Sequence, residues 1–277
     1  MAIFRRSELK WMSCGPPAST RQQLRVWYEG TPGQWLEAEE QRLLNEILPT
    51  LFGYHLLQVG VSYADDCLVS SKILNQIVMD IDQPPCVDNL RGAGLQRVKY
   101  MRGAPESLPI ASGSLDVLIL SHTLEFTANP HEILREADRS LIPDGHVVIL
   151  GFNPWGWWML WRIILRWRGK PPWCGRFIRF SRLRDWLQLL GFDIVDARGY
   201  FYRPPFAHQG LMGKLAFLEK LGSRWWTFFS GAYLIVAKKR VATLTPIRPR
   251  WRPRRSRLVA PELVGNSSAS TRDEQRG

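Results

Sequence analysis

Two aspartates, Asp80 and Asp82, end an apolar run of this 277-residue chain and lie beyond Gly60, at the end of an earlier run. A carboxylate at a strand tip can accept hydrogen bonds from both hydroxyls of a ribose, and such an acid stands about 20 residues beyond the first glycine turn of nucleotide-binding folds. We assign this role to Asp80, with Asp82 as the alternative. Gly60 lacks a Cβ atom, so its backbone can approach a ligand closely. A turn that binds no ligand would also explain a glycine at this position.

Ser121 and His122 end another apolar run and supply a hydroxyl and an imidazole. The unperturbed pKa of histidine lies near neutrality, so His122 is a candidate general base. The alternative is a histidine that hydrogen-bonds locally and transfers no proton. The four cysteines show no paired spacing of the kind that a zinc site or disulfide framework needs. No metal site is predicted, and reduced thiols are expected.

These residues need a scaffold that brings strand ends together. Apolar runs predict seven strands, at residues 54–61, 76–82, 98–102, 115–121, 146–152, 192–197 and 233–238. Helical spacing predicts helices at 34–51, 64–74, 130–141 and 182–190, the last capped by Ser181 and ended by Gly191. The last two strands are expected to form a hairpin with a large inserted excursion. Alternating strands and helices predict parallel pairing, with the ligand crevice at the carboxyl ends of the strands.

The stretch 105–151 carries a dense set of motifs. In order it reads Leu108-Pro109-Ile110, Asp116-Val117-Leu118-Ile119-Leu120, Leu124-Glu125-Phe126 and Arg135-Glu136-Ala137-Asp138-Arg139-Ser140-Leu141-Ile142-Pro143-Asp144-Gly145. This pattern resembles the class I S-adenosylmethionine-dependent methyltransferases of the type 11 methyltransferase domain group, and the resemblance covers about residues 35–240. It implies an α/β fold: a Rossmann-like, seven-stranded, mostly parallel sheet in the order 3-2-1-4-5-7-6, with helices on both faces and the last strand antiparallel.

The same resemblance implies S-adenosylmethionine as the cofactor, bound at four strand ends. The cofactor-binding residues would be Gln58, Gly60, Ser62, Asp80, Asp82, Gly103, Ala104, Pro105 and Ser121. Gln58 stands where the family has an acid, Ser62 replaces a glycine, and Ala104 replaces an aspartate that meets the adenine amino group. Ser121 and His122 are expected nearest the sulfonium. Methyl transfer needs mainly positioning, with a base only where the acceptor carries a proton.

Three parts are predicted: an irregular N-terminal arm at 1–34, a methyltransferase-like domain at 35–240 and a flexible basic tail at 241–277. A Trp-rich lid is expected at 153–175, and its segment Trp155–Trp167 is too short and too rich in Arg to cross a bilayer. A Trp-rich helix flanked by Arg fits a membrane interface or a cover over a hydrophobic substrate, and packing on the domain's own core explains it equally well. RNA stacking fits less well, because the indoles lie in an apolar helix.

The net charge is +12, and many basic residues lie late in the sequence. The tail mixes Arg with Pro and Ser and cannot bury enough apolar surface to fold. A solvated tail without a partner is the first interpretation, and a tether to nucleic acid or an anionic membrane the second. No apolar secretion signal is visible at the start of the sequence. With reduced thiols, this predicts a cytoplasmic protein, peripheral at the inner membrane face if the Trp-rich segment binds lipid.

Two functions of different classes follow. The first is an S-adenosylmethionine-dependent methyltransferase whose small-molecule acceptor, hydrophobic in character, enters between Ser121-His122 and the Trp155–Trp167 lid. The second is a catalytically silent binding protein that keeps the fold and associates with membrane or nucleic acid. A nicotinamide oxidoreductase is disfavoured because the chain has no G-x-G-x-x-G turn.

Overall fold

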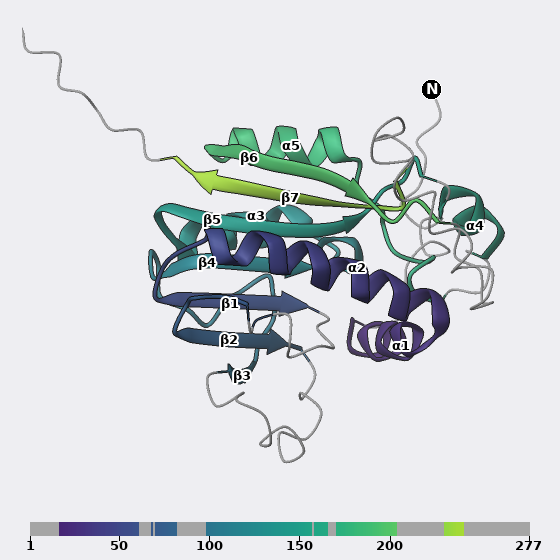
Figure 1. The fold of residues 1–277 in the computed structure, drawn as a ribbon, viewed down its shortest axis with the longest axis horizontal. Helices are drawn as coiled ribbons and strands as arrows, with labels where there is room; N and C mark the ends of the chain where they lie inside the picture. Colours follow the sequence, from purple (N-terminus) through teal and green to yellow (C-terminus); the bar gives the residue numbers. More distant parts are fainter. Residues whose placement is uncertain are drawn as a thin grey trace, which may run out of the picture. The chain divides into compact units, whose positions relative to one another are not determined.

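The apolar runs form one sheet of seven strands in the order β3-β2-β1-β4-β5-β7-β6 (Figure 1). The strands are β1 His55–Gly60, β2 Asn75–Asp80, β3 Val98–Arg102, β4 Leu115–Ser121, β5 Leu141–Phe152, β6 Phe192–Tyr200 and β7 Ala232–Lys239. Strands β1 to β5 pair in parallel, and β7 runs antiparallel to both β5 and β6. The predicted fold class and strand order are confirmed.

The computed structural model describes residues 17–60, 68, 70–81, 98–156, 158–165, 170–203 and 230–240. The chain divides into two units, Met1–Val241 and Ala242–Gly277. The second unit, with the predicted flexible tail, lies outside the described residues, as does the predicted excursion at 204–229. None of the helices in the described ranges is long and apolar enough to cross a membrane.

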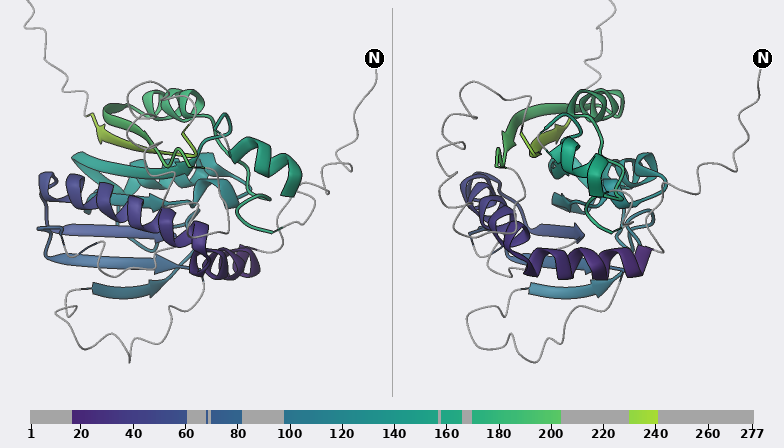
Figure 2. Two further views of the ribbon diagram at one scale, coloured as in Figure 1. Left: turned by 45° about the vertical axis from the view of Figure 1, so that its right-hand side comes forward. Right: turned by 90° about the vertical axis from the view of Figure 1, so that its right-hand side faces the viewer.

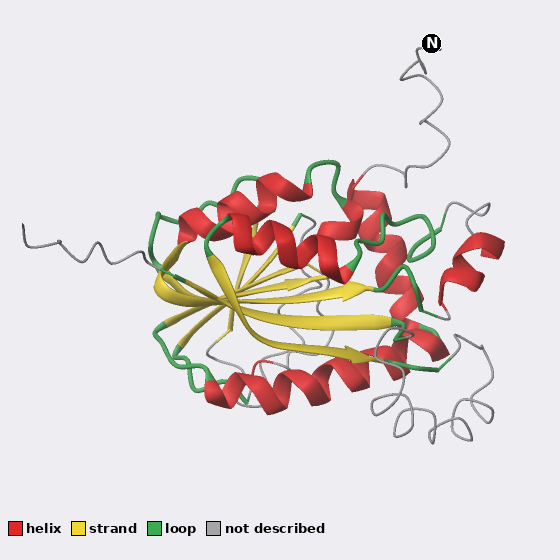
Figure 3. Ribbon diagram, turned by 90° about the horizontal axis from the view of Figure 1, so that it is seen from above, coloured by secondary structure: helices red, strands yellow, loops and turns green. Residues whose placement is uncertain are grey.

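Helices cover both faces of the sheet (Figure 3). They are α1 Pro17–Glu29, α2 Thr31–Ile47, α3 Pro130–Ser140, α4 Trp158–Leu165 and α5 Phe180–Leu189, with short 3-10 turns at Leu48–Thr50 and Leu124–Phe126. One core packs α1 and α2 against side chains such as Leu56 and Val117, and the other packs α3 and α5 against side chains such as Leu57 and Leu118. Because side chains alternate along a strand, one apolar run serves both cores.

The register brings the site residues to one edge of the sheet. Val59 of β1 pairs with Met79 of β2, and Gly60 pairs with Ser121 of β4. Asp80, one residue after Met79, therefore ends its strand beside Gly60. Figures 1 and 2 show α1 lying next to this carboxyl edge, at the tips of β1 and β2.

The predicted irregular arm is wrong for residues 17–29, which form α1, while residues 1–16 lie outside the described residues. Helix α2 begins at Thr31 and not at Gln34. Pro17 and Pro32 stand in the first turns of these two helices, where the missing N–H leaves no hydrogen bond unmade. Proline there marks the start of a helix.

Two further expectations need correction. Residues 71–74 of the helix predicted at 64–74 are not helical, and the Ser71 hydroxyl accepts a hydrogen bond from the Ile73 amide, which competes with helical pairing. Helix α5 starts at Phe180 with Arg179 at its N-cap, so Ser181 does not cap it. Gly191 follows the helix with φ +85°, as a glycine stop requires.

Cys174 is disulfide-bonded, so the expectation of reduced thiols is wrong for this residue. The other three cysteines lie outside the described residues. The argument from reduced cysteines to a cytoplasmic protein therefore does not hold.

Candidate functional site

Asp80 ends β2 with only 5% of its surface exposed and is held by two arginines of α1. Its Oδ1 accepts a hydrogen bond from Arg21 Nη1 at 2.9 Å, and its Oδ2 pairs with Arg25. Arg21 and Arg25 are one helical turn apart, so both guanidinium groups reach the same carboxylate. The carboxylate predicted to bind a ribose is thus occupied by the chain's own cations. Asp82, the alternative, lies outside the described residues, as does Ser62.

Gly60 brings the tips of β1 and β4 together. Its φ is +109°, and a Cβ atom there would collide with the Ser121 carbonyl oxygen and the Thr123 hydroxyl. The Thr123 hydroxyl donates to the Val59 carbonyl at 3.0 Å, which holds the segment after β4 against β1. The chain's own packing requires glycine at this position.

Gln58 and Ser121 are buried beside this junction, each 2% exposed. Alternation along β1 and β4 places both side chains on the face that α1 and α2 cover, as for Leu56 and Ile119. Within the described part of the chain, Gln58 Oε1 and Ser121 Oγ have no hydrogen-bond partner. A buried polar atom without a partner costs about 1–3 kcal/mol, so these two atoms favour a ligand that supplies donors.

His122 lies between two buried carboxylates that come from different elements. Its Nε2 donates to Glu40 Oε1 of α2 at 2.8 Å, and its Nδ1 lies 3.5 Å from Glu125 Oε1. Tyr200 donates to the same Glu40 oxygen at 3.0 Å, and the Phe152 amide donates to Glu125 Oε1 at 2.7 Å. His122 has φ +46°, a conformation that this network holds in place.

The charges around His122 decide its protonation state. Burial alone would lower its pKa, but the negative charges of Glu40 and Glu125 and their hydrogen bonds raise it to about 10. His122 therefore carries its proton at neutral pH and is not poised to accept another. The interpretation of His122 as a general base rested on an unperturbed pKa, and the raised pKa argues against it.

Glu40 and Glu125 are candidate-site residues that the sequence alone did not single out. Glu40 stands four residues after Leu36 and four before Leu44, so it lies on the buried face of α2. A carboxylate in the middle of an apolar helical stripe could have indicated a buried charge at this position. Glu125 was noted only as part of the family pattern Leu124-Glu125-Phe126, and nothing in its local sequence distinguishes a buried charge from an exposed one.

The loop after β3 approaches Asp80 through its backbone. The Gly103 amide donates to the Asp80 carbonyl at 3.0 Å, and the Ser107 amide donates to the Ala104 carbonyl at 3.2 Å. Ala104 is exposed and Pro105 is buried. These three predicted positions therefore stay close to the end of β2, with no polar side chain among them.

A cluster of aromatic rings connects His122 with the predicted lid. The Phe152 ring lies 4.1 Å from the His122 ring, 5.1 Å from Phe177 and 5.4 Å from Trp158, measured between centroids. Trp158 is fully buried, and its Nε1 donates to the Arg203 carbonyl at 3.1 Å. The start of α4 thus packs on the domain's own core, as one of the two interpretations of the Trp-rich segment expected.

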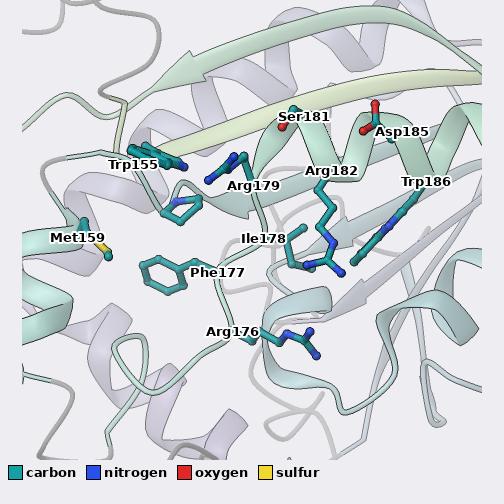
Figure 4. Close-up of a pocket in the computed structure, with 11 residues that line it drawn as sticks. Trp155, Met159, Arg176, Phe177, Ile178, Arg179, Ser181, Arg182, Asp185 and Trp186 are labelled. Atoms are coloured by element: carbon teal, nitrogen blue, oxygen red, sulfur yellow. The ribbon is translucent and has the colours of Figure 1, made fainter. Parts of the chain in front are cut away.

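Two cavities, of about 660 and 490 Å³, flank Trp155 and Arg179 in the segments after β5 and before α5. Figure 4 shows the larger one. Phe177 lines it and stacks on Phe152, so its wall is continuous with the ring cluster beside His122.

Residues 58–149 match the family described as "Methyltransferase domain". The chain is 32% identical over 205 residues to "Uncharacterized protein YafS" of Escherichia coli (strain K12), covering 74% of this chain and 76% of that protein. A solved S-adenosylmethionine-dependent methyltransferase from Mesorhizobium loti gives a TM-score of 0.51 at 14% identity, over 72% of this chain and 96% of that one. The [4+2]-cyclase SpnF gives 0.52 at 19% identity, over 73% and 80%. At these identities the two structures show the fold alone.

Proposed function

Because this chain belongs to the class I S-adenosylmethionine-dependent methyltransferase family, with its domain and its fold, we propose that it binds S-adenosylmethionine and methylates a small, hydrophobic acceptor. The cofactor would be held at the carboxyl ends of β1, β2 and β4, by Asp80, Gly60 and Ser121. The observation that carries the proposal is the pair of buried atoms Gln58 Oε1 and Ser121 Oγ beside that edge, to which the described residues supply no hydrogen-bond partner.

The residues at this edge fit the cofactor in type and place. Asp80 offers a carboxylate for the ribose hydroxyls, and Gln58 and Ser121 offer acceptors for donors of the ligand. Arg21 and Arg25 now occupy the Asp80 carboxylate, so binding requires that at least one of them exchange for the ribose. The cofactor would thus compete with α1.

The charge of the site also supports the proposal. S-adenosylmethionine supplies a methyl group attached to a positively charged sulfur. Among the described residues, two carboxyl groups, those of Glu40 and Glu125, face the single imidazole of His122. A buried negative charge favours a cation nearby. His122 orients the two carboxylates and keeps its proton, so the acceptor either carries no proton to lose or passes it to water.

The acceptor would enter through the region after β5. The smaller cavity there is lined mainly by apolar surface, from residues that include Trp155, Phe180 and Tyr233. This lining supports the proposal of a hydrophobic acceptor, because apolar cavity walls bind apolar ligands and a few polar groups orient the bound ligand.

The test is titration of the full-length protein with S-adenosylmethionine, with binding measured by isothermal titration calorimetry and by the shift in Tm. We expect saturable heat, a rise in Tm, and at least about tenfold weaker binding for Asp80→Asn, because a charged acceptor of hydrogen bonds is lost. Asp144→Asn is the matched control, since Asp144 pairs with Lys238 away from this edge. No heat and no thermal shift at millimolar cofactor would overturn the proposal.

A catalytically silent binding protein is the second candidate function. The ion pairs of Arg21 and Arg25 with Asp80 favour it, because they satisfy the carboxylate without any ligand. If Arg25→Gln, which frees one Asp80 oxygen, also shows no binding of S-adenosylmethionine, the silent function is the better explanation.

A further inference from the structure

Helix α4 is apolar on the side that faces away from the protein. Trp158 is fully buried, whereas Leu160, Ile163 and Ile164 are 55%, 56% and 65% exposed, and Met159 is 38% exposed. A helix at a protein surface normally turns polar side chains outward. A contiguous exposed group of large aliphatic side chains indicates a surface that contacts another apolar phase.

A basic cavity opens directly beside this face. It has a volume of about 660 Å³, and its lining includes Trp155, Met159, Arg176, Arg179, Arg182 and Trp186 (Figure 4). Met159 belongs to both the cavity and α4. The cavity and the outward face of α4, Met159, Leu160, Ile163 and Ile164, are together called the α4 surface below.

The three arginines of the cavity are available for an anion. Within the described part of the chain, none of them forms an ion pair with a carboxylate; Arg179 lies over Trp155 at 4.7 Å and Arg182 over Trp186 at 5.1 Å. Asp185 also lines the cavity, but Figure 4 shows its carboxylate on the opposite side of α5 from the Arg182 guanidinium. Guanidinium groups bind phosphate oxygens in a bidentate manner.

We propose that the α4 surface docks on a bilayer of anionic phospholipids. The outward face of α4 enters the boundary between headgroups and acyl chains, and the arginine cavity takes a lipid phosphate. Trp155, 60% exposed at the cavity, has the amphipathic ring that favours this boundary. The sequence directly after α4 contains Arg166, Arg168 and Lys170, so the chain next to this helix is rich in cations.

Charge argues against the other occupants of this surface. The segment 204–229 of the same chain contains Lys214, Lys220 and Arg224 against Glu219, a net charge of +2, and a second copy of the chain carries +12. Either would bring positive charge to a cavity whose three arginines form no ion pair with any described carboxylate. An anionic bilayer complements both parts of the α4 surface: its phosphates carry negative charge for the arginine cavity, and its acyl chains contact the apolar face of α4.

The test is cosedimentation of the full-length protein with vesicles of phosphatidylglycerol and phosphatidylcholine, compared with vesicles of phosphatidylcholine alone. We expect binding to the anionic vesicles, and a loss of about tenfold or more in partition coefficient for the triple variant Leu160→Gln, Ile163→Gln, Ile164→Gln. The double variant Arg179→Gln, Arg182→Gln should lose a similar factor. Circular dichroism and thermal unfolding check that each variant is folded.

Matched controls distinguish binding through the α4 surface from non-specific electrostatic binding of a basic protein to anionic vesicles. Leu189→Gln replaces an aliphatic side chain that is 85% exposed on α5, and Arg135→Gln with Arg184→Gln removes two exposed charges elsewhere. These controls should bind as the wild type does. The proposal is overturned if the wild type does not bind anionic vesicles, or if the controls lose as much binding as the α4 variants.

Two further results would assign the surface to another occupant and so overturn the proposal. One is displacement of the wild type from vesicles by millimolar glycerol 3-phosphate, which would indicate a site for a free anion. The other is a dimer in solution that the triple α4 variant dissociates, which would indicate a second copy. The inference does not depend on S-adenosylmethionine binding, because Asp80, Ser121 and Gln58 neither line the arginine cavity nor belong to α4.

Discussion

Substitution of Glu40 by Gln tests the buried charge network most directly. Gln has the shape of Glu, so its side-chain oxygen can still accept hydrogen bonds from His122 Nε2 and the Tyr200 hydroxyl, while the negative charge is removed. Glu125 remains as the partner of His122. The perturbation therefore changes charge with little change in packing.

The size of the effect follows from the pKa of His122. Its rise from 6.5 to about 10 corresponds to about 5 kcal/mol of stabilisation of the folded state, at about 1.4 kcal/mol for each pH unit. An opposite charge in contact accounts for a pKa shift of about 1–3 units, so removing Glu40 should lower the pKa of His122 by about 2 units. The expected loss of unfolding free energy at pH 7 is about 3 kcal/mol.

The pH dependence has a definite sign. A pKa raised on folding stabilises the protein fully below pH 6.5, and the stabilisation is lost as the pH rises through about 10. In Glu40→Gln that loss is complete about 2 units earlier. The difference in stability between wild type and variant should therefore be about 3 kcal/mol at pH 7 and fall below about 1 kcal/mol by pH 10.

Urea denaturation followed by circular dichroism, at pH values from 6 to 10.5, measures this difference. NMR of labelled histidine follows the titration of His122 itself. Glu39→Gln is the matched control on the same helix, because Glu39 pairs with Arg42 at the surface and should change stability by about 1 kcal/mol or less. A gap between wild type and Glu40→Gln that is independent of pH would refute the reasoning.

Three further outcomes are expected. Gly60→Ala should lower the unfolding free energy by about 2 kcal/mol or more in urea denaturation, because its φ of +109° and the nearby Ser121 carbonyl leave no room for a Cβ atom; an unchanged midpoint would contradict this. Arg25→Gln should bind S-adenosylmethionine about tenfold more tightly by calorimetry, because a competitor for Asp80 is lost, whereas Arg42→Gln should bind like the wild type. Trp158→Leu should cost about 3 kcal/mol in thermal unfolding, since a fully buried indole is lost, and a Tm within error of the wild type would argue against its place in the core.

The sheet could be predicted from the sequence because its signals are local. The central strands β1, β4 and β7 are buried on both faces and read as apolar runs. The strands Val98–Arg102 and Leu115–Ser121 have the predicted bounds. The strand order needed the family pattern, since pairing between strands leaves no trace in a single sequence. The position of Asp80 at the tip of β2 followed from these two sources together.

The contacts of the site residues could not be predicted, because they join distant parts of the chain. Glu40 and His122 are 82 positions apart in the sequence, and Arg21 and Asp80 are 59 apart. The protonation state of His122 depends on these partners, so a histidine with an ordinary pKa was the natural assumption. The helix that carries Arg21 and Arg25 was also missed, because Pro17 at its start is a residue that often interrupts helices.

The N-terminal residues that contact Asp80 and His122 lie before the part of the chain that matches the family. That match spans residues 58–149, whereas Arg21, Arg25 and Glu40 belong to α1 and α2. The strand tips provide acceptors that suit a nucleoside, and the two N-terminal helices supply the charges that meet Asp80 and His122. Whether the chain acts as an enzyme therefore depends on the free energy needed to separate α1 from Asp80. If this free energy is small, S-adenosylmethionine replaces the arginines at Asp80. If it is large, the arginines stay bound to Asp80 and exclude the cofactor. Binding of S-adenosylmethionine to Arg25→Gln but not to the wild type would identify the second case.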